Sequence, residues 1–141
     1  MKIYQAGPLF TDAERRWHVA FRAELEAAGH EVVWPGELIT DELLRAWGAD
    51  SARRVMETDR DALLACDAAV ALLDGAQVDD GTAWEIGYAC AVGIPVVGIR
   101  TDFRRCGDTD AGVVNAMIQG SVACVARDIP GALAALERLK K

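Results

Sequence analysis

The hydrophobic positions of the chain follow two patterns that alternate along its length. Short, almost continuous apolar runs occupy residues 2–6, 31–34, 67–73, 95–100 and 122–126. Such runs are typical of parallel strands that are buried on both faces. Between the first two runs, Trp17, Ala20, Phe21 and Leu25 recur at the spacing of a helix that buries one face. We therefore expect strands and helices to alternate.

Polar residues, glycines and prolines mark the ends of the predicted helices. Thr11-Asp12-Ala13-Glu14 matches a capping box, in which the Thr and Glu side chains satisfy free backbone donors, and Gly29 is placed to end the helix that follows. Gly93 ends a later helix in the same way, and Asp128 with Pro130 begins the last one. After the first helix, the pattern predicts helices over residues 41–49, 51–65, 82–92 and 113–119 and from 128 onward.

Five strands separated by helices predict an α/β fold. Right-handed crossovers then give a doubly wound, five-stranded parallel sheet with helices on both faces, the class of flavodoxin-like and Rossmann-like proteins. A length of 141 residues fits one domain over residues 1–141. Ligands of such sheets bind at the carboxyl ends of the strands. The expected site therefore lies near Gly7-Pro8, Trp34-Pro35, residues 74–80 and the loop after residue 100.

Composition narrows the possible functions. The formal net charge of −7 opposes binding to a nucleic-acid backbone. No apolar run reaches the roughly 18 residues of a membrane span, and the first residues lack the long apolar stretch of a signal peptide, so we expect a cytoplasmic protein. The motifs GxGxxG and GxxxxGK[ST] are absent, which argues against dinucleotide and P-loop nucleotide binding.

The cysteines and histidines give no sign of a metal site. The four cysteines include no CxxC pair and the chain has only two histidines, so the spacing of a structural zinc site is absent and no metal is expected. Cys66, Cys90 and Cys124 stand in apolar segments and are expected in the core, whereas Cys106, in a polar loop, is expected to be exposed.

The segment after the third predicted strand holds most of the candidate chemistry. Asp74, Asp79 and Asp80 precede a helix at an expected ligand-binding edge, and Glu85 follows near the start of that helix. Because Thr82-x-x-Glu85 matches a capping box, one interpretation is purely structural. In the other, the helix dipole keeps the carboxylate ionised as the nucleophile of glycosyl transfer, while a second carboxyl group handles the proton of the leaving base.

The chain as a whole resembles the nucleoside 2-deoxyribosyltransferase family. The resemblance covers most of the chain and rests on the order and spacing of short motifs. These are Ile3-Tyr4-x-Ala6-Gly7-Pro8-Leu9-Phe10, Asp59 with Cys66-Asp67, Asp79-x-Gly81-Thr82-Ala83-x-Glu85-x-Gly87-Tyr88-Ala89, Arg100-Thr101-Asp102-x-Arg104 and Asn115-Ala116-Met117.

The resemblance implies a role for each matching residue. Glu85 would attack the anomeric carbon of a 2′-deoxynucleoside and carry the glycosyl group covalently, so that the 2-deoxyribosyl group passes from one nucleobase to another. Asp59 would shuttle the proton of the base, and Asp79 would hold the deoxyribose hydroxyls. Tyr4 would orient the nucleophile, and the Gly7-Pro8 turn would contact the substrate.

The resemblance also implies an assembly. Asn115 and Met117 match residues that come from a neighbouring subunit to complete the sugar pocket, so a homo-oligomer with shared active sites is implied. The substrates would be a deoxynucleoside and a free nucleobase, as in nucleotide salvage, and neither a metal nor an organic cofactor would be needed.

Each of these residues also has a plainer interpretation. Asp59 lies in a predicted helix beside Asp61 and near Glu57, so it is either the family's acid or a solvated residue, with Asp61 as the other candidate. Tyr4 fits a core position of a strand, and Asn115 fits the cap of a short helix.

The alternative function is hydrolysis of the same bond, in 2′-deoxynucleosides or in (deoxy)nucleoside 5′-monophosphates. The related 2′-deoxynucleoside 5′-phosphate N-hydrolases resemble this chain around Ala116-Met117-Ile118. They usually carry Ser where Asn115 stands, and a Ser- and Arg-bearing loop where Pro8-Leu9-Phe10 stands, to hold the phosphate. Because this chain lacks these Ser and Arg residues, an unphosphorylated nucleoside is the favoured substrate. Transfer or hydrolysis then depends on whether a base or water reaches the glycosyl-enzyme.

Overall fold

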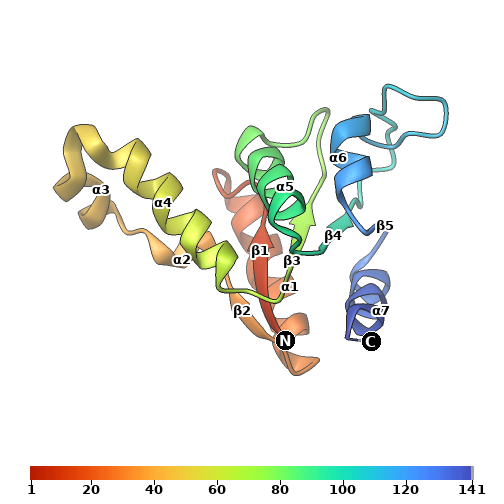
Figure 1. Ribbon diagram of the computed structural model, residues 1–141, viewed down its shortest axis with the longest axis horizontal. Coiled ribbons are helices and arrows are strands. Elements are labelled where there is room, and N and C mark those ends of the chain that lie inside the picture. The colour runs from red at the N-terminus through yellow and green to blue at the C-terminus, as the bar shows by residue number, and fades with distance from the viewer. Residues whose placement is uncertain (141) are drawn as a thin grey trace.

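A five-stranded parallel sheet forms the centre of the computed structural model, which describes residues 1–140 (Figure 1). The strands stand in the order β2-β1-β3-β4-β5, and every pair of neighbours is parallel. Their bounds are β1 Lys2–Ala6, β2 Glu31–Val33, β3 Ala68–Leu72, β4 Val96–Ile99 and β5 Cys124–Ala126. The order reverses between β1 and β3, which is where doubly wound sheets open a crevice for ligands.

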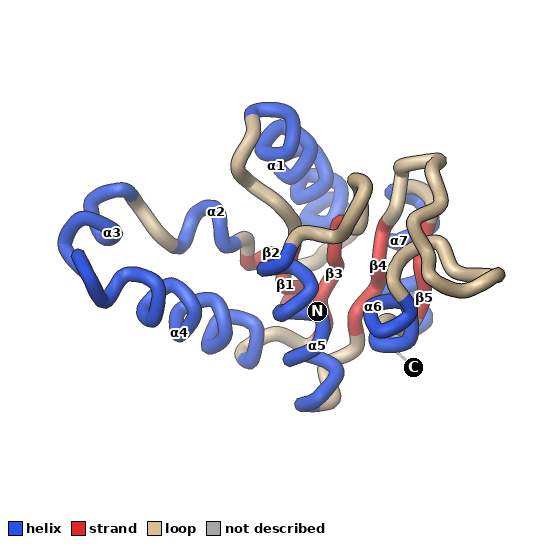
Figure 2. Tube along the Cα trace, turned by 90° about the horizontal axis from the view of Figure 1, so that it is seen from above, coloured by secondary structure: helices blue, strands red, loops and turns tan. Residues whose placement is uncertain are grey.

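Helices cover both faces of this sheet (Figure 2). The first face carries α1 (Asp12–Ala27) and α7 (Ile129–Leu139), and the second carries α4 (Ser51–Leu64), α5 (Asp80–Val92) and α6 (Ala116–Ser121). Beyond the β2 edge, the chain forms α2 (Pro35–Leu38), α3 (Asp41–Trp47) and the 3-10 turn Gly48–Asp50. The predicted α/β fold is therefore confirmed.

Alternation along β1 divides its side chains between two cores. Ile3 packs with Phe21 and Leu25 of α1 on the first face, whereas Tyr4 and Ala6 belong to the core under α4 and α5. The apolar runs form strands because both faces of the sheet are covered, so a parallel strand gains from apolar residues at nearly every position. As a result, the side chain of Tyr4, in the middle of β1, points into the second face.

The structure corrects the predicted start of α5. This helix begins at Asp80, two residues before the predicted position, because the Asp79 side chain caps it by accepting a hydrogen bond of 3.0 Å from the Thr82 backbone N–H. Thr82 is therefore not the cap, and the capping-box interpretation of Glu85 is wrong. The outer face of α5 is open, so Cys90 is exposed and not in the core as expected.

The other differences in bounds are small. Helix α6 covers residues 116–121, a few residues after the predicted 113–119, since Asn115 caps it and the preceding residues form a loop. Among residues 1–140, no helix combines the length and the apolar character required to cross a membrane.

Candidate active site

Tyr4 and Glu85 form the centre of the candidate site. The Tyr4 hydroxyl donates a hydrogen bond of 2.5 Å to Glu85 Oε1, linking the first strand to the second turn of α5. The Tyr4 side chain is fully buried, and burial together with the Glu85 carboxylate raises the pKa of Tyr4 well above its ordinary value. Tyr4 is thus a core residue that also keeps its hydroxyl proton pointed at Glu85.

Glu85 is less readily ionised than the helix-dipole argument suggested. Burial raises the pKa of Glu85 to about 7, and the nearby carboxyl groups of Asp59 and Asp79 act in the same direction, while the Tyr4 hydrogen bond opposes them. The dipole effect is strongest in the first turn of a helix, and Glu85 lies beyond it because α5 begins at Asp80. Burial and the neighbouring side chains therefore determine the pKa of Glu85 more than the helix dipole does.

Asp59 of α4 supplies a second carboxyl group to the same cavity. Burial raises the pKa of Asp59 to about 6, and its Oδ1 atom is buried without a hydrogen-bond partner within the described chain. Asp61 is exposed and pairs with Arg60 at 2.7 Å, so of the two candidates only Asp59 faces the site. A buried carboxyl oxygen without a partner is costly unless a ligand satisfies it.

Asp79 has both a structural and a ligand-facing position. Its Oδ2 atom accepts hydrogen bonds from the backbone N–H and the hydroxyl of Thr82, at 3.0 and 3.1 Å. Its carboxyl group also lines the cavity that holds Asp59 and Glu85. The second oxygen of Asp79 makes no protein hydrogen bond among residues 1–140.

The cavity has a volume of about 360 Å³ and two chemically different walls. One wall carries the three carboxyl groups. The other is apolar and comes from the loop after β1 and from the α2–α4 region, with Leu9, Pro35, Ile39, Leu44 and Val55. An apolar wall facing a few convergent polar groups is the usual form of a site for a small organic ligand.

Most of the apolar wall was missed in the sequence. The sequence places Trp34-Pro35 at a strand end, but Ile39, Leu44 and Val55 line the cavity only through the tertiary packing of the α2–α4 region. Gly7 lines the cavity as expected, whereas Pro8 does not and instead offers its carbonyl oxygen to His18 at 3.1 Å.

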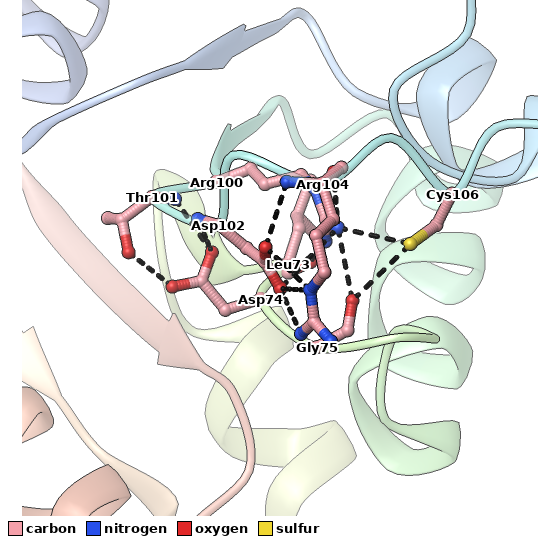
Figure 3. A network of polar contacts seen from close by, with 8 residues as sticks. All are labelled: Leu73, Asp74, Gly75, Arg100, Thr101, Asp102, Arg104 and Cys106. Atoms are coloured by element: carbon pink, nitrogen blue, oxygen red, sulfur yellow. Dashed lines mark hydrogen bonds and ion pairs between the residues drawn. The ribbon is translucent and has the colours of Figure 1, made fainter.

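Arg100 holds the loops beside the site in place (Figure 3). Its side chain is buried at the end of β4, and its guanidinium group donates to the carbonyl oxygens of Leu73, Gly75 and Arg104. It also contacts the Cys106 sulfur at 3.3 Å. The Cys106 side chain is consequently half-buried and not fully exposed as expected.

The three acids of the segment after β3 have different partners. Asp74 accepts hydrogen bonds from the backbone N–H groups of Thr101 and Asp102, at 2.6 and 2.9 Å, which ties this segment to the loop after β4 (Figure 3). Asp79 caps α5 and faces the cavity, whereas Asp80 is exposed beside a second cavity. Only one of the three therefore reaches Glu85.

Asn115 and Met117 do not join the Glu85 cavity of their own chain. They line the second cavity, of about 560 Å³, on the other side of α5. Asn115 caps α6 by accepting a hydrogen bond of 3.0 Å from the Met117 backbone N–H, and it donates to Asp108 at 3.0 Å. The Met117 side chain is 79% exposed. Within residues 1–140, the structure contains no group of three or more potential metal ligands arranged to hold an ion.

Comparison with known proteins identifies the family of this chain. The family model described as Nucleoside 2-deoxyribosyltransferase matches residues 3–117. The chain belongs to the nucleoside 2-deoxyribosyltransferase family. Members of this family act on nucleosides and nucleobases. The resemblance found in the motifs is thereby confirmed.

Several solved structures share the fold of this deoxyribosyltransferase-family chain. A conserved protein from Enterococcus faecalis V583 is 31% identical, covers 98% of both chains and superposes with a TM-score of 0.83. The 2-deoxyribosyltransferase from Bacillus psychrosaccharolyticus is 23% identical over 92% of this chain and 88% of its own, with a TM-score of 0.76. The CMP N-glycosidase BcmB from Clostridium botulinum is 21% identical over 97% and 99%, with a TM-score of 0.61.

A curated relative matches only in part. The uncharacterized protein C191.05c from Schizosaccharomyces pombe is 38% identical over 61 residues, which are 40% of this chain and 29% of that protein. The match therefore spans less than a third of the length of this relative.

Proposed function

We propose that this protein transfers the 2-deoxyribosyl group between nucleobases, with Glu85 as the covalent nucleophile. The observation that carries the proposal is the hydrogen bond between Tyr4 and Glu85 Oε1 beside the unpartnered carboxyl oxygen of Asp59. Together they offer an oriented nucleophile and a proton donor in a single cavity, as cleavage of a glycosidic bond requires.

In the first half-reaction, the ionised Glu85 attacks C1′ of the deoxynucleoside. A bond forms between a carboxylate oxygen and C1′ while the bond from C1′ to the base nitrogen breaks, and the electron pair of that bond stays with the base. Asp59 gives its proton to the leaving base. Tyr4 keeps its hydrogen bond to Oε1 throughout, because its raised pKa holds the phenol proton in place.

In the second half-reaction, the incoming base attacks C1′ from the side that the first base left. Its nitrogen forms the new glycosidic bond, Glu85 leaves with the electron pair, and the Asp59 carboxylate recovers a proton from the base. The free oxygen of Asp79 accepts a hydrogen bond from a deoxyribose hydroxyl and keeps C1′ over the nucleophile. The elevated pKa values of Asp59 and Glu85 suit this repeated exchange of one proton near neutral pH.

The charge of the cavity favours an unphosphorylated nucleoside. Its charged lining side chains within residues 1–140 are Asp59, Asp79 and Glu85, all of one sign. A 5′-phosphate would bring further negative charge beside three carboxyl groups, and the lining residues within 1–140 include no Arg or Lys to pair with it. We therefore assign 2′-deoxynucleosides as the substrate class.

We also propose that Asn115 and Met117 act in the site of a neighbouring subunit. Their position supports this: Met117 stands out into solvent at the start of α6, and Asn115 is exposed beside it. Side chains with these positions are available to a second copy of the chain. The active unit would then be a homo-oligomer.

The experiment that tests the proposal is a two-substrate assay. The protein is incubated with one deoxynucleoside, with and without a different free base, and the products are separated by chromatography. Formation of a new deoxynucleoside supports transfer, whereas release of free base and sugar alone supports hydrolysis. Cleavage of a deoxynucleoside 5′-monophosphate without cleavage of the nucleoside would overturn the substrate class. Glu85→Ala is the matched control and should form neither product.

A further inference from the structure

The cavity wall formed by the loop after β1 is held by side chains of α1. Arg15 donates a hydrogen bond of 2.9 Å to the carbonyl oxygen of Leu9, and the Glu14 carboxylate accepts from the Phe10 backbone N–H at 3.0 Å. Both of these side chains lie near the surface. The remaining polar contact comes from His18, whose ring is fully buried behind Gly7.

His18 contacts the wall from the side opposite the cavity. Its Nε2 atom lies 3.1 Å from the carbonyl oxygen of Pro8. A Cβ atom added to Gly7 would stand 2.6 Å from the ring, so the ring and the backbone of Gly7 are in direct contact. Gly7 and Leu9 line the cavity that holds Glu85. The backbone of the loop after β1 therefore lies between the His18 ring and the cavity.

The tautomer of His18 follows from its other neighbour, Gln5. The Gln5 Nε2 atom lies 2.9 Å from the backbone carbonyl oxygen of His18, which can only accept, so this end of the Gln5 amide is the NH₂ group. The same NH₂ group lies 2.8 Å from His18 Nδ1. His18 Nδ1 must therefore accept, which leaves the ring proton of a neutral imidazole on Nε2. That proton points at the Pro8 carbonyl oxygen.

The same ring also supports the part of the apolar wall that comes from α2. His18 stacks on Trp34, with ring centroids 5.6 Å apart and an interplanar angle of 24°. Trp34 in turn lies under Gly36, where an added Cβ atom would come within 2.5 Å of the indole ring. Gly36 and its neighbour Pro35 line the cavity. One buried imidazole thus supports both the loop after β1 and the start of α2.

We infer that His18 is a positioning residue of the active site, held by Gln5 as the neutral Nε2–H tautomer so that its donation to the Pro8 carbonyl fixes the Gly7–Phe10 wall against the substrate. This role rests on the proposed function, since the wall matters for catalysis only if the Glu85 cavity binds the nucleoside. Burial lowers the pKa of His18, in keeping with a ring that stays neutral.

Two substitutions separate positioning from simple packing. In His18→Gln, the amide nitrogen can take the place of Nε2 and keep the donation to Pro8. In His18→Asn, the shorter amide reaches only the position of Nδ1 and leaves the Pro8 carbonyl without its donor. Both variants lose the aromatic ring, so a purely structural role predicts similar thermal midpoints and similar activities for the two.

We expect His18→Gln to retain most of the wild-type kcat/KM. His18→Asn should lose about tenfold, mainly through a higher KM, which corresponds to one lost hydrogen bond. The pH dependence should stay unchanged in both, because the Tyr4–Glu85 pair lies on the other face of β1. Equal activities of the two variants at equal thermal midpoints would contradict the positioning role.

Nuclear magnetic resonance tests the same inference without turnover. Long-range ¹H–¹⁵N correlation of the wild-type protein at pH 7 should show a neutral His18 with its proton on Nε2, and His30→Gln assigns the signals because the chain has only two histidines. The backbone amides of Gly7 and Leu9 should shift in His18→Asn and stay near their wild-type positions in His18→Gln. A charged ring, an Nδ1–H tautomer or equal shifts in both variants would overturn the inference. Absence of turnover in the wild-type protein, with these signals as expected, would instead contradict the proposed function.

Discussion

The Tyr4 hydroxyl and Glu85 Oε1 lie 2.5 Å apart, in a hydrogen bond between side chains that are 81 positions apart in the sequence. The bond stabilises the ionised form of Glu85, whereas burial and the neighbouring carboxyl groups oppose ionisation. Tyr4 therefore orients the proposed nucleophile and favours its ionised form against the larger effect of burial.

Removal of the Tyr4 hydroxyl should weaken the nucleophile. In Tyr4→Phe the pKa of Glu85 rises further, because the hydrogen bond that lowers this pKa is lost. We expect kcat/KM to fall by about ten- to a hundredfold, the effect of one hydrogen bond to a charged group. The alkaline limb of its pH profile should move to higher pH, because the pKa of Glu85 is already above that of Asp59 and sets that limb. Tyr88→Phe is the control, since Tyr88 stacks on Trp84 and does not line the cavity. An unchanged profile for Tyr4→Phe would contradict the role of Tyr4.

The pH dependence of catalysis should be bell-shaped. The reactive form needs Glu85 ionised and Asp59 protonated, and burial raises their pKa values to about 7 and about 6. The pH profile of kcat/KM reports the pKa values of the free enzyme. We therefore expect kcat/KM to be highest between about pH 6 and pH 7. In Asp59→Asn the alkaline limb should disappear along with most of the activity. A wild-type rate that rises steadily to pH 9 would rule out Asp59 as the proton donor.

The same raised pKa makes Glu85 a cost to stability. Its pKa is 4.5 ordinarily and about 7 in the folded protein, so between these values the folded state binds more protons and stability falls as the pH rises. We expect Glu85→Gln, which keeps an oxygen for the Tyr4 hydroxyl, to raise the free energy of unfolding at pH 8 by about 3 kcal/mol. Below pH 4 the variant and the wild type should be alike.

Denaturant unfolding at pH 4 and pH 8 checks this difference. Glu24→Gln serves as the control, because Glu24 is exposed on α1, and it should leave stability unchanged at both pH values. If Glu85→Gln lowers the free energy of unfolding at pH 8, the buried Glu85 carboxylate does not destabilise the folded protein as its raised pKa indicates.

Sharing of residues between subunits can be tested by mixing inactive variants. Glu85→Ala lacks the nucleophile, and Asn115→Ala lacks the residue that would complete a neighbour's sugar pocket. If sites are shared, co-refolded oligomers of the two contain some sites with both residues intact, and activity should return. A mixture that stays as inactive as its components, while size measurements show mixed oligomers, would place Asn115 outside the site.

Much of the fold was predictable because the strands carry their own signal. A parallel strand covered on both faces must be apolar at nearly every position, and the runs at residues 2–6 and 67–73 correspond to β1 and β3. The start of α5 was misplaced because Asp79 and Thr82 are both good caps. Only the three-dimensional course of the loop decides which oxygen meets the free backbone donors.

The candidate site was predictable in its acids and not in its environment. Asp59, Asp79 and Glu85 were found through the motifs of the family, and the structure places them around one cavity. The pKa of Glu85 was misjudged because desolvation depends on tertiary packing, which the sequence does not show. His18 was missed for the same reason. A single histidine in an amphipathic helix does not indicate which backbone carbonyl group its ring will contact.

The covalent intermediate is the most direct test of the account. The protein is mixed with a deoxynucleoside in the absence of an acceptor base, quenched in acid within the first turnover, digested and analysed by mass spectrometry. We expect one deoxyribosyl group on the peptide that contains Glu85, its loss when an acceptor base is added before the quench, and no adduct in Glu85→Ala. Turnover without an adduct on this peptide, or an adduct that persists in Glu85→Ala, would contradict Glu85 as the nucleophile.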